Sequence, residues 1–287
     1  MIIDGKAIAA AVLARAKARA EKLPRMPRVV ALAGADTPAT RSYLKIKERA
    51  AGFAGCAFET RPLGADTSDA DAVIVQLPVP EGVSRDAVLD AIPLTKDADV
   101  LSHAAREQFE TAKWVDTGCP PILPPVVAAI AEIFAVHGVA PEGKPAAVLG
   151  RGLLVGAPAA TWLAQKGAQV TVLDIDTQPE EFSAALRAAA IVVSGTGIPH
   201  LIKPAMLKEA KTAENGSPDD SRSEPFRGVV LIDAGTSELG GKLTGDADPA
   251  CAEKCSLFTP VPGGIGPVAV AMLFENATLL AERNLSF

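Results

Sequence analysis

Short apolar runs alternate along the chain with longer segments whose apolar residues recur at helical spacing. The apolar runs are typical of buried strands, and they lie within residues 29–33, 71–77, 147–149, 170–173, 191–193 and 229–233. Residues 56–61 are also predicted as a strand. The segments between them predict helices at residues 4–23, 39–54, 84–92, 126–137, 159–166, 204–210 and 268–284, with a further helix from residue 179. Residues 101–118 have weak periodicity and are assigned only as helix or loop. An alternation of strands and helices predicts the α/β fold class.

One stretch, residues 146–174, contains a strand, a glycine turn, a helix and a second strand in immediate succession. The turn carries Gly150, Gly152 and Gly156, a spacing one residue longer than the usual dinucleotide fingerprint. Glycines let the backbone approach a pyrophosphate closely, and the start of a helix offers it free N–H groups. Asp174, at the tip of the second strand, could accept hydrogen bonds from a ribose diol. The stretch predicts a dinucleotide site, the alternative being a turn whose glycines serve only packing.

The N-terminal half carries polar side chains where open α/β sheets bind ligands. Thr37 and Pro38 form a good helix start, as N-cap and first helical residue. Tyr43 and Lys47 lie four residues apart and therefore share one face of that helix. Gln76 lies near the carboxyl end of a buried strand, the end at which such sheets bind ligands. From the residues alone, these could also be an ordinary surface pair and an ordinary polar residue at a strand end.

Composition narrows the function classes. The 287 residues carry a net charge of −6 without a cluster of lysine and arginine, which argues against nucleic acid as a partner. No apolar run approaches the roughly 18 residues of a membrane span, and the start has no signal peptide, so we expect a cytoplasmic protein with no membrane partner. Of the four cysteines only Cys251 and Cys255 are close, with no histidine near them, so we expect free thiols and no metal site.

Two polar or proline-rich segments divide the chain. Residues 120–125 form a proline-rich hinge, and we place a domain boundary at about residue 120. Residues 211–227 are rich in serine, proline and aspartate, so we expect an exposed, mobile loop there.

Several motifs follow one another in a fixed order. They are Asp4-Gly5-Lys6, Ser42-Tyr43 with Lys47, Val75-Gln76-Leu77-Pro78-Val79-Pro80, Lys96-Asp97-Ala98-Asp99, Gly150-Arg151 with Val155-Gly156 and Pro158, and Thr259-Pro260-Val261-Pro262-Gly263-Gly264-Ile265-Gly266-Pro267. In this order they resemble the bifunctional methylenetetrahydrofolate dehydrogenase/cyclohydrolase family. The match covers nearly the whole chain, and its Gln-Leu-Pro-x-Pro and Pro-Val-Pro-Gly-Gly-x-Gly-Pro motifs are specific.

The resemblance implies a fold, two reactions and a set of partners. The fold would be an N-terminal α/β folate-binding domain at residues 1–120, a Rossmann-type doubly wound parallel sheet domain at 121–267, and a cleft between them. The last helix, 268–287, would pack back on the first domain. With NAD or NADP the enzyme would oxidise 5,10-methylenetetrahydrofolate to the methenyl form, and water would then give 10-formyltetrahydrofolate. The implied partners are the folate, the dinucleotide and a second copy in a homodimer.

The resemblance also assigns four catalytic residues. Lys47 would transfer the proton in the hydrolysis, and elementary chemistry agrees, because burial and a cationic substrate both favour the neutral form of a lysine. Tyr43 would stack on the folate, and Gln76 would hold Lys47 in place. Asp99 would accept two adjacent N–H donors from the pterin edge, which is a bidentate match.

The other site residues lie in glycine-rich turns. By resemblance, the backbone of Pro262, Gly263 and Gly264 would approach the folate substrate or the cofactor. The expected cofactor-binding residues are Gly150, Arg151, Gly152, Gly156, Pro158, Asp174, Thr196, Gly197 and Pro199. Arg151 could pair with the 2′-phosphate of NADP, but Asp174 would repel that group, so we expect the chain to favour NAD over NADP.

The chain departs from the family pattern at several positions. A helix expected between residues 62 and 71 is missing, the glycine usual after Asp99 is Val100, and the serine usual after Arg151 is Gly152. These changes alter the wall of the pocket. The alternative function is therefore a relative that binds folate or nicotinamide without catalysis or with an altered substrate.

Overall fold

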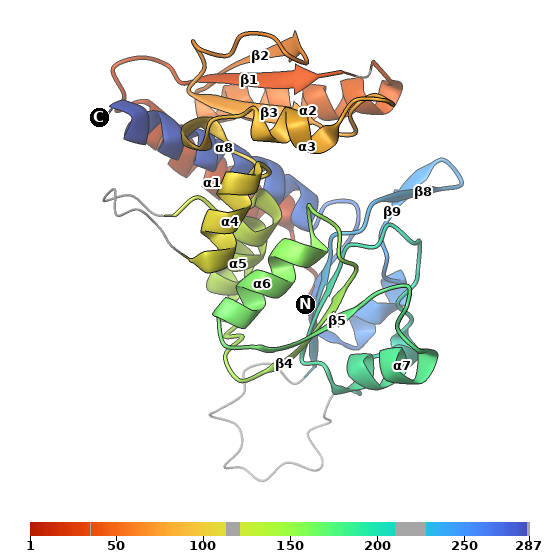
Figure 1. Ribbon diagram of the computed structural model, residues 1–287. Helices are drawn as coiled ribbons and strands as arrows, with labels where there is room; N and C mark the ends of the chain where they lie inside the picture. The colour runs from red at the N-terminus through yellow and green to blue at the C-terminus, as the bar shows by residue number, and fades with distance from the viewer. Residues whose placement is uncertain (35, 113–120, 210–227, 286–287) are drawn as a thin grey trace. The chain divides into compact units, whose positions relative to one another are not determined.

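The computed structural model describes residues 1–34, 36–112, 121–209 and 228–285 (Figure 1). Two compact units make up the chain. The three-stranded unit comprises Ala7–Ala129 and the residues from Val268 onward, and the five-stranded unit comprises Met1–Lys6 and Ile130–Pro267. The predicted loop 211–227 lies outside the described residues.

The three-stranded unit is built on a parallel sheet in the order β2-β1-β3. Its strands are β1 (Arg28–Ala33), β2 (Ala57–Pro62) and β3 (Ala72–Gln76). All of β3 and the interior of β1 are buried, which explains their continuous apolar sequences. The helices of this unit are α1 (Gly5–Ala20), α2 (Pro38–Ala54), α3 (Arg85–Asp90), α4 (His103–Thr111) and most of α8 (Ile265–Leu285), while α5 (Pro125–His137) is divided between the units.

Helix α2 begins and ends at residues that its sequence marks. Thr37 is the N-cap, and its Oγ1 accepts a hydrogen bond of 3.1 Å from the backbone N–H of Thr40. Pro38 follows in the first turn, where its missing N–H has no intrahelical partner to lose. Gly55 ends the helix in the left-handed conformation at φ 72°. The predicted start of this helix is confirmed, and the two caps fix which face each of its side chains occupies.

The five-stranded unit is built on a fully parallel sheet in the order β10-β7-β6-β4-β5. Its strands are β4 (Pro145–Leu149), β5 (Gln169–Leu173), β6 (Ile191–Ser194), β7 (Val229–Asp233) and β10 (Cys255–Thr259), with helices α6 (Gly156–Gln165) and α7 (Pro179–Ala188) between the first three. Because β5 and β6 lie on opposite sides of β4, the strand order reverses at β4. The predicted fold class is therefore confirmed. Doubly wound sheets bind ligands beyond the carboxyl ends of the strands at such a reversal, so we expect a ligand site at the turns after β4 and β6.

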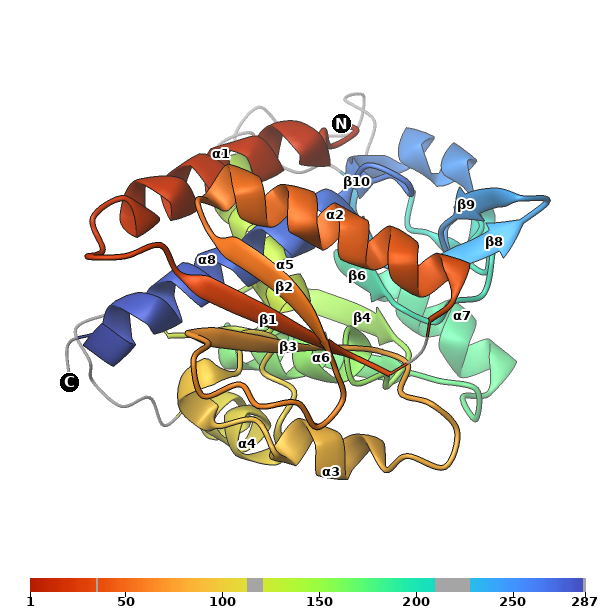
Figure 2. The same cartoon turned by 90° about the horizontal axis from the view of Figure 1, so that it is seen from above.

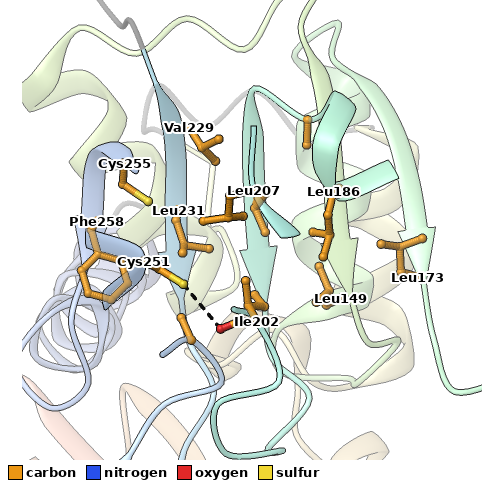
Figure 3. Close-up of a cluster of buried hydrophobic side chains, with 14 residues drawn as sticks. Leu149, Leu173, Leu186, Ile202, Leu207, Val229, Leu231, Cys251, Cys255 and Phe258 are labelled. Carbon is orange, nitrogen blue, oxygen red and sulfur yellow. Dashed lines mark hydrogen bonds between the residues drawn. The ribbon is translucent and has the colours of Figure 1, made fainter. Parts of the chain in front are cut away.

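The core of the five-stranded unit packs aliphatic side chains from the sheet and from the segments that cover it (Figure 3). Leu149 lies on β4, Leu186 on α7, and Cys251 donates a hydrogen bond of 3.4 Å to the carbonyl of Ile202. Burial raises the pKa of Cys251 to about 11 and that of Cys255 to about 12. Both thiols therefore stay protonated near neutral pH and behave as small apolar side chains.

Two strands of the hairpin and one strand of the main sheet were not predicted. The antiparallel hairpin β8 (Ser237–Leu239) and β9 (Lys242–Thr244) turns at Gly240 and Gly241, both at positive φ, which is a two-residue turn that the sequence does signal. Strand β10 has the sequence Cys255-Ser256-Leu257-Phe258-Thr259. The polar Ser256 near its start shortens the apolar run to two residues, so the pattern did not predict a strand.

Three helix predictions need correction. Helix α6 begins at Gly156, not at Ala159, because Pro158 is tolerated in the first turn of a helix. The helix predicted at 204–210 is only a short 3-10 turn, Pro204–Met206, and α8 begins at Ile265, a few residues before its predicted start.

Helix α8 is long and apolar enough, by length and composition, to cross a membrane, but most of it is buried inside the protein. It runs beside α1 (Figure 2), and the Arg15 guanidinium donates two hydrogen bonds of 2.6 and 2.8 Å to Glu275. The buried Asn276 amide donates to the carbonyls of Ala98 at 2.9 Å and Leu123 at 2.8 Å. Helix α8 therefore holds the motif Lys96-Asp97-Ala98-Asp99 through the carbonyl of Ala98, from within the unit.

Replacing Asn276 by leucine should destabilise the chain, because the buried carbonyl of Ala98 and the part-buried carbonyl of Leu123 would lose their donor. We expect the free energy of unfolding to fall by about 2–4 kcal/mol, since each unsatisfied buried group costs about 1–3 kcal/mol. Denaturant unfolding measures the change. The matched control is Asn284→Leu on the same helix, where an exposed amide donates to Thr95 at 3.1 Å and water can replace it. Equal losses in the two variants would contradict the expected anchoring role of Asn276.

Candidate functional site

A lysine and a glutamine meet at the carboxyl end of β3. The Lys47 ammonium, on α2, donates a hydrogen bond of 3.0 Å to Oε1 of Gln76. The Gln76 amide donates in turn to the backbone carbonyl of Leu77 at 2.8 Å. Because its N–H₂ group is held by that carbonyl, the amide oxygen is left to face the lysine. Gln76 is buried, so this pair is a fixed feature of the unit and not a surface encounter.

The tyrosine one turn before the lysine presents its ring to solvent. Tyr43 is 47% exposed, although it is four residues from Lys47 on the same helix. An exposed aromatic ring beside a fixed lysine provides a flat surface on which a planar ligand can stack.

Asp99 brings a carboxylate into the same group. It is half-buried, and burial raises its pKa to about 6, with the charge of Lys47 acting in the opposite direction and that of Asp97 adding to the rise. The charge of Lys47 acts on Asp99, so this acid lies near the lysine and its partner Gln76. Three residues predicted to act together are therefore brought together by the fold.

The loop that carries Asp99 is shaped by a second, buried aspartate. Oδ2 of Asp97 accepts hydrogen bonds from the backbone N–H groups of Leu101 at 3.0 Å and Ser102 at 2.8 Å. Val100, directly before Leu101, adopts the left-handed conformation at φ 58°. This conformation is unfavourable for a β-branched residue. The family pattern has glycine at this position, and the present chain keeps the same turn with a buried valine.

The turn after β4 requires glycine for steric reasons. Gly150 has φ 94°, and its N–H donates to the carbonyl of Leu173 at 2.8 Å. A Cβ on Gly156 would lie 2.0 Å from the carbonyl oxygen of Gly150, which no real side chain allows. Helix α6 has no side-chain cap at its start, but the N–H of Ala157 donates to the carbonyl of Gly152 and Pro158 has no N–H. In this first turn, the N–H of Gly156 is therefore the donor that could face an anion. The unusual glycine spacing therefore still produces a turn that can approach a phosphate.

The remaining residues of this turn differ in exposure. Arg151 and Gly152 are exposed, whereas Pro158 is buried in the first turn of α6. Nε of Arg151 donates to Oδ2 of Asp174 at 2.5 Å, and this hydrogen bond lowers the pKa of Asp174. The arginine and the acid at the tip of β5 therefore form one ion pair, which the sequence did not predict.

The turn after β6 lies against the glycine turn after β4. Gly195 donates to the carbonyl of Leu149 at 3.1 Å, and a Cβ on Gly150 would lie 3.6 Å from Cγ2 of Thr196. Thr196, Gly197 and Pro199 retain exposed surface. The predicted cofactor residues after β4 and β6 are thus adjacent at the reversal of strand order.

The glycine-rich turn after β10 packs on the N-terminus of the chain. The N–H of Gly5 donates to the carbonyl of Gly263 at 3.0 Å, and a Cβ on Gly5 would collide with the carbonyl oxygen of Gly264 at 1.7 Å. Gly263 has φ 101°, a conformation that favours glycine. Pro262 is exposed and Gly264 buried, so the first part of this turn offers its backbone to a ligand.

Two buried acids near these turns were missed. Asp246, in the segment Gly245-Asp246-Ala247-Asp248, is 0% exposed, and Asp233 at the end of β7 is 1% exposed. Burial raises the pKa of Asp233 to about 6, and the charge of Asp246 adds to the rise. For Asp246, the sequence signal for burial was Gly245 directly before it, because a glycine permits close approach of neighbouring segments.

Comparisons with known proteins agree with this arrangement. The family model described as Tetrahydrofolate dehydrogenase/cyclohydrolase, NAD(P)-binding domain, matches residues 124–213 and 222–285. The chain is 34% identical over 304 residues to the Bifunctional protein FolD of Magnetococcus marinus, covering 98% of this chain and 97% of that protein.

Two solved structures resemble the chain over 99% or more of its length. The bifunctional enzyme FolD from Campylobacter jejuni, a methylenetetrahydrofolate dehydrogenase/cyclohydrolase, has a TM-score of 0.86 and 27% identity, with 99% of each chain covered. The dehydrogenase-cyclohydrolase of Trypanosoma brucei, complexed with NADP cofactor and inhibitor, has a TM-score of 0.85 and 28% identity, with 100% of this chain and 99% of that chain covered. The chain belongs to the tetrahydrofolate dehydrogenase/cyclohydrolase family.

Proposed function

We propose that this chain carries out both reactions of its family and that Lys47, Gln76, Asp99 and Tyr43 form the folate site. As a member of the family it oxidises 5,10-methylenetetrahydrofolate with a nicotinamide dinucleotide and hydrolyses the methenyl product to 10-formyltetrahydrofolate. The single observation that carries the residue roles is the fixed Lys47–Gln76 hydrogen bond beside Asp99. We assign the folate roles to the three-stranded unit and dinucleotide binding to the five-stranded unit, with Pro262, Gly263 and Gly264 contributing backbone to either ligand.

The oxidation and the hydrolysis differ in whether they need a side chain that transfers protons. In the oxidation, the C–H bond of the methylene bridge breaks and its hydride passes to the nicotinamide, which supplies the electron acceptor, so no protein base is needed. In the hydrolysis, water adds to the methenyl cation and loses one proton, which leaves a neutral carbinol. The bond from that carbon to N5 then breaks as N5 gains a proton, and the hydroxyl loses its remaining proton to become the formyl oxygen, so that one proton is released overall. Lys47 is placed to take the proton from water and return one to N5, and Gln76 keeps its Nζ in position.

Asp99 is the group suited to the pterin edge. A carboxylate accepts two parallel N–H donors in a bidentate arrangement, and the half-buried position of Asp99 excludes part of the competing water. Tyr43 supplies the flat ring on which the conjugated part of the folate would stack.

The dinucleotide would lie on the turns after β4 and β6. Gly150 and Gly156 allow the pyrophosphate to approach the start of α6, and Gly152, Thr196, Gly197 and Pro199 contribute surface around it. Buried Pro158 acts through the shape of the first helical turn.

Within the nicotinamide dinucleotides, we propose NAD as the preferred cofactor. Asp174 can accept hydrogen bonds from the ribose diol of NAD. NADP would bring a phosphate of charge near −2 beside that carboxylate, while Arg151, the cation available to neutralise it, already pairs with Asp174.

We also propose that the chain is a cytoplasmic homodimer, as the family resemblance implies. Leu239 and Leu243 on the hairpin β8–β9 are exposed apolar side chains that a partner copy could cover. Sedimentation at micromolar concentration distinguishes a dimer from a monomer.

Lys47→Met should abolish the hydrolysis and spare the hydride transfer, because only the water step needs the lysine proton. General acid–base catalysis typically contributes about 10²- to 10⁴-fold, so we expect at least a hundredfold loss of cyclohydrolase activity. The measurement follows the methenyl product and the reduced nicotinamide by their absorbances. Lys45→Met is the matched control, since Lys45 is an exposed lysine on the same helix. Hydrolysis at the parent rate in Lys47→Met would remove the lysine from the mechanism.

The folate affinity should depend on the ionisation of Asp99. Burial raises the pKa of this group to about 6, so the carboxylate prevails above that pH and the neutral acid below it. Because the pterin N–H donors require the carboxylate, kcat/KM for folate should fall about tenfold per pH unit below that pKa. Asp99→Asn should show a lower kcat/KM that no longer follows this titration. A profile of the same shape in Asp99→Asn and the parent would show that another group controls it.

Asp174→Ser should shift the cofactor preference toward NADP, because the substitution removes the repelling carboxylate and releases Arg151. We expect the ratio of kcat/KM for NADP to that for NAD to rise on the order of tenfold. The matched control is Asp176→Ser, which removes an exposed acid two residues further on. A parent chain that already prefers NADP tenfold or more would mean that Asp174 does not face the adenosine ribose.

A further inference from the structure

Asp233 and Asp246 of the five-stranded unit have no part in the function described so far. Asp233 is the last residue of β7, and Asp246 lies two residues after β9. Both side chains are almost completely buried. A buried carboxylate is costly unless it is hydrogen-bonded, so the donors that satisfy each one show what it holds in place.

Asp246 is bound to the end of β6 and the turn that follows. Its Oδ2 accepts three hydrogen bonds, from Oγ of Ser194 at 2.6 Å, from the N–H of Thr196 at 2.7 Å and from Oγ1 of Thr196 at 2.9 Å. Oγ1 of Thr196 then accepts from the N–H of Ile198 at 3.2 Å. One carboxylate oxygen therefore fixes the backbone from Ser194 to Ile198.

That turn cannot move independently of the glycine turn after β4. A Cβ on Gly195 would lie 2.4 Å from Cγ1 of Val155, the residue directly before α6. The carbonyl oxygen of Gly195 lies 3.1 Å from the position that a Cβ on Gly150 would occupy. A displaced Thr196 turn would therefore disturb the surface on which the pyrophosphate is expected to bind.

Asp233 fixes the position of Asp246. Its Oδ1 accepts from the N–H groups of Gly235 and Asp246, both at 3.1 Å, and its Oδ2 accepts from Ala247 at 2.9 Å. A Cβ on Gly235 would lie 1.9 Å from Oδ1 of Asp246, and one on Gly245 would lie 2.1 Å from Oδ2 of Asp233. These contacts hold the backbone of Asp246 against Asp233 and leave no room for a side chain at Gly235 or Gly245.

We infer that Asp246 is a positioning residue for dinucleotide binding, acting through the backbone of the Thr196 turn. The inference rests on the proposed binding of the dinucleotide at the turns after β4 and β6. Its effect should be confined to the cofactor, because Lys47, Gln76 and Asp99 belong to the other unit. The hydrolysis uses no dinucleotide and therefore provides an internal reference within the same protein.

The test is Asp246→Asn, which keeps the size of the side chain but replaces its charge-assisted hydrogen bonds with neutral ones. We expect the KM for the dinucleotide to rise about tenfold or more, because hydrogen bonds to a charged group are stronger than those to a neutral one. The KM for folate and the cyclohydrolase kcat, measured with the methenyl substrate, should stay within about twofold of the parent. Asp246→Ala should give a larger rise in the same constant, so that asparagine acts as a partial rescue.

The matched control is Asp248→Asn, in the same segment. Asp248 caps the next turn through the N–H of Ala250 at 3.0 Å and pairs with Lys203 at 3.1 Å, so its loss should leave the KM for the dinucleotide unchanged. Thermal unfolding of all three variants measures any general loss of structure.

Two results with Asp246→Asn would overturn the inference. One is an unchanged KM for the dinucleotide, and the other is a parallel loss of cyclohydrolase activity, which indicates general damage. Dinucleotide binding by calorimetry separates this inference from the proposed reaction. A parent that binds dinucleotide but does not turn over folate would contradict only the reaction, and the affinity of Asp246→Asn would still decide the inference. A parent that binds no dinucleotide would overturn both.

Discussion

Buried carboxylates shape the loops at the ends of both sheets. A carboxylate removed from water must keep its hydrogen bonds, because an unpaired buried charge is strongly destabilising. The donors within reach are largely backbone N–H groups of neighbouring loops. Asp97 binds the N–H groups that follow it in the three-stranded unit, and Asp233 binds those of Gly235, Asp246 and Ala247 in the five-stranded unit. Each acid thus holds the backbone of its loop in one conformation through these hydrogen bonds.

This arrangement also affects the chemistry. The charge of Asp97 contributes to the raised pKa of Asp99, so the residue that shapes the loop also tunes the acid it carries. Gln76 also has two roles, because its amide donates to a backbone carbonyl and its amide oxygen accepts from Lys47. Groups that must act on a ligand are therefore held by neighbours that are themselves fixed by the backbone, which keeps their geometry independent of side-chain rotation.

Local signals explain which parts of the fold were predictable. Thr37 and Pro38 mark the start of α2 because capping depends on residues within one turn. The central strands were recognisable because parallel strands buried on both faces are continuously apolar. Strand β10 was missed because Cys255 and Ser256 weaken that signal and its strand character comes from pairing with β7.

The unpredicted parts of the site depend on contacts between distant segments. Asp246 looks like a solvated loop acid in the sequence, and its burial follows from hydrogen bonds to Asp233, 13 residues earlier, and to Ser194, 52 residues earlier. The pair between Arg151 and Asp174 likewise depends on how β4 and β5 align. Motif resemblance identified the Lys47, Gln76 and Asp99 group, which residue spacing alone could not separate from ordinary surface residues.

Two of the departures from the family pattern, Val100 and Gly152, have different physical consequences. Val100 adopts a left-handed conformation that costs about 1–3 kcal/mol, but its side chain is buried, which contributes about 1.5–3 kcal/mol. These terms are comparable, and Asp97 and Asn276 hold the loop on either side, so the fold absorbs this change. Gly152 differs, because a Cβ there would meet only the carbonyl oxygen of Gly195 at 4.0 Å. A serine would fit, so its replacement by glycine has no steric cause and acts by removing a hydroxyl from the exposed rim where the cofactor is proposed to bind.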